Sequence, residues 1–440
     1  MIKMKKLSLL FNTLFAKNEE LAENRKNIVI EQFFAGTTNT LVSNNYFTGL
    51  LILLKLNETT IGNISVLNSL GGVFQAFSVL FLGKYKRKKN IIIFWKGIAY
   101  FLNIILIGCI PFLGLNELSK TMAIFTLIFS VTFISGIINP GMAAWHVKSI
   151  PREIRNNYFS FFTVALNAVT FLVTFFSGRI ADEFKAGGNE LLGLMVLRIF
   201  ATIAAVFDLI WLQKIREYPD ASESRSVSLK MLSVPLRDNT YRKTILVSVL
   251  WAFSSSITGP YYNLYLLKDM HVQYTTMALV NMCFIVTLFL FIPVWSRKIR
   301  KTSYFKTLGF LMSLFLLHYF ILSCVTSSTM ILYPIGACYS YIFQAGISVI
   351  TAGLPYYQIA DEKQISYIGC YSTASSIATF LGTEVGTLFI TFSTKANIVL
   401  FGLTFGNIQL LMVFSAFVMF CSTMWIRKIE KNLQQERKSA

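Results

Sequence analysis

Long apolar segments separated by short polar stretches run along the whole of this chain. Each segment is long enough to cross the ~30 Å hydrocarbon core of a bilayer as a helix, which takes about 20 residues. The segments lie near 27–54, 59–82, 90–113, 119–145, 159–182, 190–213, 244–268, 274–296, 304–326, 329–357, 366–392 and 397–426. Backbone groups in lipid must be hydrogen-bonded within the protein, as they are in a helix or a closed barrel. Apolar and polar residues do not alternate here as they do in barrel strands, so the segments must be helices. The sequence therefore predicts an all-α integral membrane fold with twelve transmembrane helices.

The composition excludes several other classes of protein. Hydrophobic residues make up 54% of the chain and charged residues only 14%, against roughly 25% in an ordinary soluble domain. This balance argues against a soluble enzyme, a disordered chain and a disulfide scaffold. The six cysteines all fall within apolar segments and no pair has CxxC spacing, so neither a metal centre nor a redox centre is indicated. We expect no cofactor.

The basic residues are distributed unevenly between the two sides of the predicted membrane. The net charge is +19, with 40 Lys and Arg. If the N-terminus is cytoplasmic, 32 of these lie in cytoplasmic segments and 5 in outer loops. Because cytoplasmic loops carry an excess of Lys and Arg, this ratio predicts that both termini are cytoplasmic and that the protein lies in the cell membrane. It also accounts for the basicity without a nucleic-acid partner.

One internal polar segment divides the chain into two halves. Residues 214–243 form the longest polar stretch between spans and contain Pro219 and Pro235. They separate a predicted six-helix bundle at 27–213 from a second bundle at 244–426, with cytoplasmic tails at 1–26 and 427–440. A short internal similarity, between Asn157–Leu172 and Ser366–Leu381, falls at corresponding positions of the two halves. This is the arrangement expected of a parallel repeat.

Short motifs at three cytoplasmic loops add to this layout. Leu80–Lys89 contains a basic cluster, Trp295–Lys301 is a fainter copy in the second half, and Pro151–Ser160 has the form Pro-x-x-x-Arg-x-x-Tyr-Phe. The layout and these loops together resemble the major facilitator superfamily, although Gly83 or Lys84 stands where that family has an Asp. The resemblance implies two pseudo-symmetric six-helix bundles and secondary transport by alternating access. Helix 4 has no Arg and helix 5 no Gly-Pro pair, which departs from the family's usual drug/proton antiporters.

Ionisable residues within the spans are the first functional candidates, because each is costly in lipid unless it faces a cavity or a partner. Glu31 and Glu384 are the acids that we expect to exchange a coupling proton. The alternatives are that Glu31 pairs with Lys26 or another cytoplasmic base at headgroup level and that Glu384 makes an inter-helix hydrogen bond. For Asp208 and Arg198, on a helix that the resemblance makes peripheral, we expect structural roles, and the expected partner of Asp208, near the cytoplasmic end, is a basic residue of a loop.

Neutral polar residues form a second group of candidates. They lie on helices that the resemblance places around a central cavity, and they suggest a small polar organic solute as the substrate. Each alone is also compatible with a hydrogen bond between helices. The set comprises Asn39, Asn45, Gln75, Asn139, Asn167, Tyr261, Asn281 and Gln344. Gly71 and Gly72, and Gly136 with Gly141, are interpreted as close-packing points or hinges.

The remaining predictions concern the basic loops, the partners and the rival functions. A set of loop residues is expected to fix topology and to contact anionic lipid or neighbouring helix ends as the bundles move. It contains Lys84, Lys86, Arg87, Lys88, Lys89 and Arg155. The expected partners are a small-molecule substrate, a coupling proton and membrane lipids, and we expect a monomer. The sequence contains neither an HExxH nor a GxSxG motif, so it gives no support for an enzyme. A proton-coupled transporter is favoured, and the alternatives are an uncoupled facilitator, an exporter or a non-transporting membrane receptor.

Overall fold

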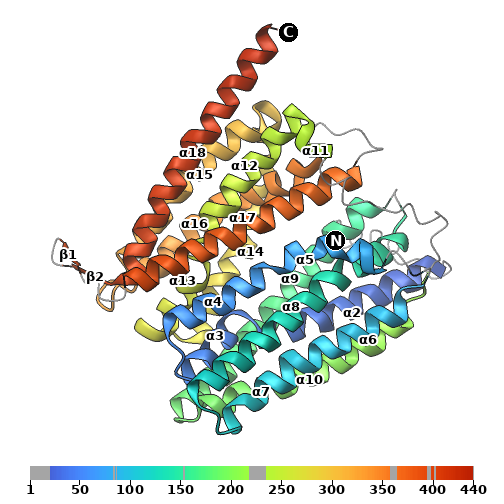
Figure 1. Ribbon diagram of the computed structural model, residues 1–440, viewed down its shortest axis with the longest axis vertical. Coiled ribbons are helices and arrows are strands. Elements are labelled where there is room, and N and C mark those ends of the chain that lie inside the picture. Colours follow the sequence, from blue (N-terminus) through green and yellow to red (C-terminus); the bar gives the residue numbers. More distant parts are fainter. Residues whose placement is uncertain are drawn as a thin grey trace, which may run out of the picture. The chain divides into compact units, whose positions relative to one another are not determined.

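The computed structural model describes residues 20–82, 85, 87–151, 154–217, 234–356, 364–393, 398–400 and 403–439, and nearly all of them are helical (Figure 1). Lys84 and Lys86, most of the predicted 214–243 segment and the first 19 residues lie outside the described part. Apart from helices, the described part contains one short antiparallel hairpin, in which β1 (Ile398–Leu400) pairs with β2 (Leu403–Phe405). The all-α fold predicted from the sequence is confirmed.

The first half of the chain forms the helices α2 to α10. In order they are α2 (Glu20–Val42), α3 (Asn44–Leu53), α4 (Glu58–Ser69), α5 (Gly71–Leu82), α6 (Lys89–Tyr100), the π-helix η1 (Phe101–Leu106), α7 (Ile107–Cys109), the short η2 (Ile110–Phe112), α8 (Glu117–Lys148), α9 (Arg155–Ala186) and α10 (Glu190–Lys214). Asn57 and Asn116 cap α4 and α8, their side chains accepting from the backbone N–H three residues on. Helix α2 begins seven residues before the predicted span, so part of the expected tail is helical.

The second half forms the helices α11 to α18. They are α11 (Val234–Arg237), α12 (Asn239–Ser256), α13 (Gly259–Leu264), the π-helix η4 (Tyr265–Asp269), α14 (Tyr274–Lys301), α15 (Tyr304–Ser323), α16 (Leu332–Gly353), the short η5 (Leu354–Tyr356), α17 (Gln364–Phe392) and α18 (Asn407–Ser439). Helix α12 begins inside the segment predicted to be the central loop. Helix α18 starts later and runs further than the predicted last span at 397–426, and the strands β1 and β2 lie in the first part of that predicted span.

Eight helices in the described part are long and apolar enough to cross a membrane, and a ninth span is a pair bent by 44° between Leu288 and Leu290. The other three predicted spans are interrupted: 27–54 at Ser43, 59–82 at Leu70, and 244–268 at Ile257 and Thr258. Interrupted helices are tolerated at membrane depth only where neighbouring protein or a water-filled cavity satisfies the freed backbone groups. These three spans are therefore where the fold departs from plain membrane-crossing helices.

The helices are apolar on their outer faces as well as on their inner faces. In α10, Leu197, Ala201 and Ala204 are buried, whereas Phe200 and Phe207 are half exposed. A helix that is hydrophobic all round belongs in a large core or in a membrane. Together with the eight apolar spans, this pattern identifies an integral membrane protein.

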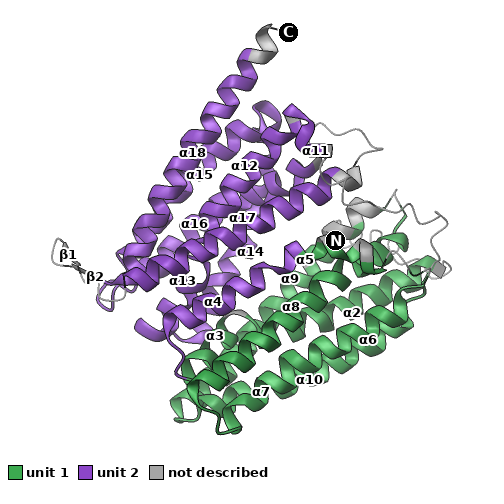
Figure 2. Cartoon of the chain, in the orientation of Figure 1, with its two compact units in different colours: residues 1–54, 74–226 green, residues 55–73, 227–440 purple. Residues whose placement is uncertain are grey.

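Contacts divide the chain into two compact units, residues 1–54 with 74–226 and residues 55–73 with 227–440 (Figure 2). In unit 1, α10 packs against α2 and α9, and α6 packs against α8. In unit 2, the main pairs are α15 with α18, α12 with α17, and α14 with α16. The segment 55–73, which carries α4 and the first three residues of α5, belongs to unit 2, whereas the rest of α5 belongs to unit 1. The second predicted span is thus shared between the units.

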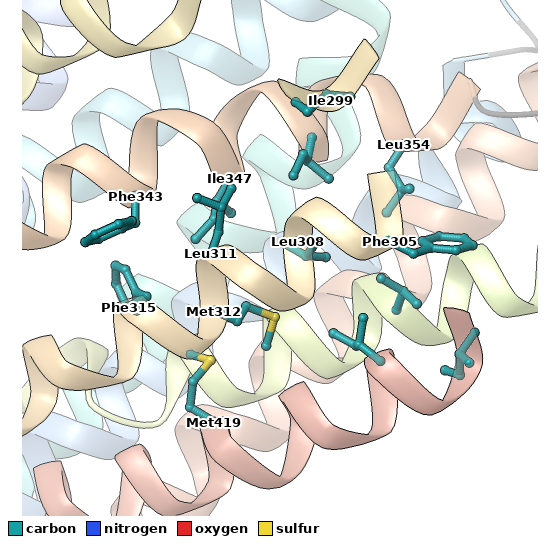
Figure 3. Close-up of a cluster of buried hydrophobic side chains, with 14 of the residues drawn as sticks. Ile299, Phe305, Leu308, Leu311, Met312, Phe315, Phe343, Ile347, Leu354 and Met419 are labelled. Carbon is teal, nitrogen blue, oxygen red and sulfur yellow. The ribbon is translucent and has the colours of Figure 1, made fainter. Parts of the chain in front are cut away.

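A large apolar cluster holds unit 2 together (Figure 3). Phe315 and Phe343 lie against each other from α15 and α16, and Met312 of α15 lies beside Met419 of α18. Dispersion contacts of this kind drive helix association in lipid, where burying apolar surface brings no gain over contact with acyl chains. The cluster fixes α15 as the helix on which α16 and α18 are assembled.

Candidate functional site

A lysine in the middle of an apolar helix joins two carboxylates from two other helices of unit 1. The Lys96 ammonium of α6 lies 2.7 Å from Glu31 Oε1 of α2 and 2.8 Å from Asp208 Oδ2 of α10. The side chains of both acids are fully buried, and the Lys96 side chain is 9% exposed. The three groups therefore form one buried ion network that links three helices.

Two further side chains complete the hydrogen bonding of this network. The Tyr100 hydroxyl donates to Asp208 Oδ2 at 2.6 Å, and Gln32 Nε2 donates to Glu31 Oε2 at 2.8 Å. Lys96 Nζ also donates to Asp208 Oδ1 at 3.0 Å. Every carboxylate oxygen of the pair thus has a donor, which a buried charge requires. With both acids ionised, the network holds two negative charges and one positive charge.

The ends of α6 and α10 are tied together close to the network. The Lys89 ammonium donates to the carbonyls of Gln213 and Ile215, at 2.5 and 2.8 Å, where the last carbonyls of α10 lack helical partners. In return, the Glu217 carboxylate accepts from the backbone N–H groups of Lys88 and Lys89 at the start of α6. Opposite charges at the two helix ends also suit the helix dipoles. Lys96 lies about two turns along α6 from these contacts, and Asp208 lies about two turns from them along α10. The contacts between the helix ends therefore help to hold Lys96 and Asp208 close together.

The contacts between the ends of α6 and α10 bear on the role expected of the basic loop. Lys89 and the backbone of Lys88 bind protein groups rather than the membrane surface, whereas Arg87 is exposed. Arg155 begins α9, and its side chain is not among those described. Of the two contacts expected of the loop, with anionic lipid or with neighbouring helix ends, Lys89 makes the second, because its ammonium contacts two carbonyls at the α10 end.

Arg198 has the structural contacts that its position on α10 suggested. Its guanidinium donates to the carbonyls of Asn103 and Ile104, at 2.8 and 3.0 Å, within the π-helix η1. A π-helical turn disturbs the regular hydrogen-bond ladder of a helix and leaves carbonyls that need donors. Arg198 supplies these donors and thereby stabilises the irregular turn in the third predicted span.

In unit 2, α4 packs closely against α17 and α13. A side chain at Gly62 would overlap the Tyr261 hydroxyl and reach 2.8 Å from Thr387 Oγ1. Ser69 and Thr383 are hydrogen-bonded at 3.5 Å. Just beyond the end of α4, a side chain at Gly72 would overlap Ser376, which confirms Gly72 as a close-packing point. Small and hydroxyl residues thus allow these helices to approach closely.

Polar contacts at the start of α4 hold it at two points of unit 2. Glu58 Oε1 lies 2.8 Å from Lys268 Nζ at the end of η4, and Glu58 Oε2 accepts from Asn407 Nδ2, at the start of α18, at 2.8 Å. Beside Lys268, burial raises the pKa of Asp269, and the Glu58 carboxylate acts in the same direction, while Lys268 and His271 oppose it. Removing the Glu58 charge would therefore ease ionisation of Asp269. We call Glu58, Lys268 and Asn407 the α4 clamp.

A pair of glycines brings α17 against the interrupted seventh span. Side chains at Gly382 and Gly386 would overlap the backbone carbonyls of Phe253 and Ile257. The two glycines are four residues apart, as are the two carbonyls, so this is a Gly-x-x-x-Gly contact between helices. Ile257 is the residue at which the span breaks between α12 and α13. The sequence analysis did not single out this motif, although its spacing is visible in the printed sequence.

The other predicted site residues have simpler surroundings. Asn281 accepts from the Tyr341 hydroxyl at 2.9 Å, joining α14 to α16. Asn167 donates to the Thr163 carbonyl of its own helix. Three are exposed and three half-buried; the exposed ones are Asn39, Gln75 and Asn139, and the half-buried ones are Asn45, Gln344 and Glu384. Tyr261 is fully buried against Gly62.

Two expectations about the buried acids need correction. Glu31 pairs with Lys96 rather than with Lys26, and Asp208 pairs with the same Lys96 rather than with a loop base. The sequence analysis also missed Tyr100. The signal that could have found the network is the lone Lys96 in an otherwise apolar helix, which needs an anionic partner at that depth. Among the described residues, no three His, Cys, Asp or Glu side chains come together as metal ligands.

Comparisons with known proteins show which solved structures have a similar arrangement of helices. No family model matches the sequence and no curated protein matches it. The structure of the POT family transporter PepTSo is similar, with a TM-score of 0.69 at 10% identity over 94% of this chain and 98% of that one. A bacterial homologue of the iron transporter ferroportin, in an inward-facing state, has a TM-score of 0.69 at 12% identity over 93% and 99%. This chain has the major facilitator superfamily fold.

A third similar structure belongs to the nucleoside transporter NupG, with a TM-score of 0.66 at 13% identity over 94% of this chain and all of that one. These similar structures are thus a nucleoside transporter, a homologue of an iron transporter and a POT family transporter. At such low identity the likeness concerns the fold, which the resemblance of the loops had predicted. What this chain carries must be argued from its own residues.

Proposed function

We propose that this protein is a secondary transporter that moves a small polar organic solute by alternating access, coupled to a proton. The observation that carries the proposal is the buried network in which Lys96 binds both Glu31 and Asp208. In a fold that many transporters use, an ionisable cluster at membrane depth is a functional site by default. The chain also forms two compact units, and movement of one structural repeat against another is how secondary transporters alternate access.

The charge of the network supports a role in proton binding. Two carboxylates facing one ammonium carry a net negative charge when both are ionised, and an unbalanced charge is costly in a low-dielectric interior. Uptake of one proton by either carboxylate would make the network neutral. Because α2, α6 and α10 each contribute one group, a change in protonation would alter the attraction between these helices. This gives a physical link between proton binding and movement within unit 1.

The substrate class rests on the neutral polar side chains. Asn281 and Tyr341 present an amide and a hydroxyl on α14 and α16, and Asn39 and Asn139 are exposed on the helices of unit 1. Such groups recognise hydroxyl, amide or heterocyclic hydrogen-bonding groups. An uncoupled facilitator, an exporter of the same fold and a non-transporting receptor are the competing functions.

Reconstituted liposomes can test coupling directly. With an imposed pH gradient and pyranine inside the vesicles, we expect one of uridine, dialanine or glucose to drive proton entry through the wild-type protein. Glu31→Gln and Asp208→Asn should each abolish solute-driven proton entry while retaining exchange of labelled solute, because exchange needs no net proton movement. Glu117→Gln, which removes an exposed acid at the start of α8, is the control and should behave as wild type.

Two results would contradict this assignment. Unchanged proton entry in both Glu31→Gln and Asp208→Asn would remove the network from coupling, and loss in Glu384→Gln alone would assign coupling to that acid. Transport of solute with no proton movement in the wild type would favour the facilitator.

The orientation of the chain is a further proposal that labelling can test. The uneven distribution of basic residues favours cytoplasmic termini in the cell membrane. In a background without the native cysteines, a single cysteine at Asn189, between α9 and α10, should react with an impermeant thiol reagent in intact cells. A cysteine at Thr302, between α14 and α15, should react only after the cells are opened. The reverse pattern would invert the proposed topology.

The α4 clamp yields a prediction about the conformational equilibrium. We expect Glu58→Gln to weaken the attachment of α4 to unit 2 by about 1 kcal/mol, because partly exposed ion pairs contribute up to that amount. The population in which α4 has left α17 should rise about fivefold. A single cysteine at buried Thr383, which faces Ser69 of α4, should then react faster with a small impermeant thiol reagent. Glu117→Gln should leave the rate unchanged. If the cysteine reacts no faster in Glu58→Gln than in Glu117→Gln, the clamp does not hold α4 against α17.

A further inference from the structure

A basic cavity lies between the first turns of α12 and the last turns of α18, both in unit 2. Its volume is about 230 Å³, and it is lined by Asn239, Arg242, Lys243, Leu246, Ile429 and Asn432. Of these described lining residues, two are cationic, two are amides and two are aliphatic. The ends of the two helices lie at the same end of the unit (Figure 2). The cavity thus combines positive charge with an apolar wall.

Two acids near the cavity, Asp238 and Glu430, accept hydrogen bonds from groups outside its lining. Asp238 accepts from the backbone N–H of Tyr241 and from the Tyr367 hydroxyl, at 3.1 and 3.2 Å. Glu430 accepts from the Ser303 hydroxyl at 2.9 Å. Within the cavity wall, Asn239 Oδ1 accepts from Arg242 Nη2 at 2.9 Å, which orients the guanidinium. The wall is therefore suited to an anion that accepts hydrogen bonds from Arg242.

The depth of the cavity matches the headgroup region of a bilayer. Trp425 of α18 is 55% exposed, and exposed tryptophans concentrate at the membrane–water interface. Ile429 and Asn432 lie four and seven residues beyond it, or about 6 and 10 Å along the helix axis. Phe417 and Phe420, on the other side of Trp425, are more than half exposed as lipid-facing residues would be. The basic groups thus lie just outside the hydrocarbon core.

We propose that this cavity binds the phosphate of an anionic phospholipid, with Arg242 and Lys243 contacting the phosphate and Leu246 and Ile429 contacting the start of the acyl chains. Basic pockets between transmembrane helices bind acidic headgroups in this way. A guanidinium held in place by Asn239 gives the phosphate a directed donor. The aliphatic pair favours a lipid over a free phosphate ion, which has no apolar part.

Native mass spectrometry of the full-length protein in detergent can measure this binding. Dioleoylphosphatidylglycerol is titrated against the wild type, with dioleoylphosphatidylcholine as the neutral comparison. We expect one phosphatidylglycerol to bind at least tenfold more tightly than phosphatidylcholine. The variant with Arg242→Gln and Lys243→Gln should weaken it about 30-fold, since each basic residue near the surface contributes ~1 kcal/mol. Arg427→Gln with Lys428→Gln, an exposed pair on α18 outside the cavity, is the matched control and should change affinity less than threefold.

Other outcomes would overturn the proposal. An equal loss in the control variant would indicate diffuse attraction to anionic lipid rather than a site. Displacement of the first phosphatidylglycerol by 10 mM inorganic phosphate would make the cavity a site for free phosphate. If the double variant fails to fold, Asn432→Glu places a negative charge at the exposed rim and should weaken binding at least tenfold. Unchanged affinity in that variant would exclude the cavity as the binding site of the phospholipid.

Discussion

Replacing Lys96 with Met should lower the free energy of unfolding by about 3–5 kcal/mol. Among the described residues, Lys96 is the ion-pair partner of both Glu31 and Asp208, so the substitution leaves two fully buried carboxylates near each other. Breaking a buried ion pair from one side is strongly destabilising, because the remaining charge keeps its desolvation cost without its partner. The free energy can be measured by unfolding in mixed micelles with increasing dodecyl sulfate.

A charge-balanced variant provides the control for this experiment. The combination of Lys96→Met, Glu31→Gln and Asp208→Asn removes all three charges and should recover most of the lost stability, because a neutral replacement of a buried ion network is often tolerated. If the triple variant is as unstable as Lys96→Met alone, packing rather than charge explains the loss. If Lys96→Met is as stable as wild type, the network does not carry buried charge.

Replacing Gly386 with Val should destabilise unit 2 by about 3 kcal/mol. A side chain at this position would overlap the Ile257 carbonyl, which is backbone and cannot move aside as a flexible side chain could. Overpacking typically costs 1–3 kcal/mol, and the upper end applies where the backbone has to shift. Thermal unfolding in detergent, followed by circular dichroism, would measure the loss as a lower midpoint.

Gly259→Ala is the matched control for that change. Gly259 lies two residues after Ile257, and a side chain there would meet nothing within 4 Å. This variant should therefore be neutral or slightly stabilised, because alanine restricts the unfolded chain more than glycine does. Equal stability of Gly386→Val and wild type would show that α12 and α17 do not need their close approach.

The apolar segments predicted most of the fold because lipid permits few alternatives. A chain with this many spans must pair its backbone groups within helices, so segment lengths alone indicated where α8, α10, α15 and α16 lie. The basic loops then favoured the major facilitator layout. Gly72 and Gly141 were correctly interpreted as close-packing points, since side chains there would overlap Ser376 and Leu82. Their partners could not be read from a single sequence.

The interruptions of the spans could not be predicted from the hydropathy of the segments. Hydropathy averages over about 20 residues, so a break of one or two residues at Ser43, Leu70 or Ile257 does not change it. The assignment of α4 to unit 2 was missed for a related reason: it depends on contacts of Gly62 and Glu58 with residues that are about 200 to 350 positions away. Only the packed structure brings these residues together.

The sequence by itself determined that the chain is a helical membrane protein and that Glu31 and Asp208 are costly residues that need partners. The tertiary structure decided which partner they have. Lys96 is 65 residues from Glu31 and 112 residues from Asp208 along the chain, so no local pattern connects them. They meet because α2, α6 and α10 pack side by side, and in a low-dielectric interior a buried acid is tolerated only where a donor or a cation lies within hydrogen-bond distance.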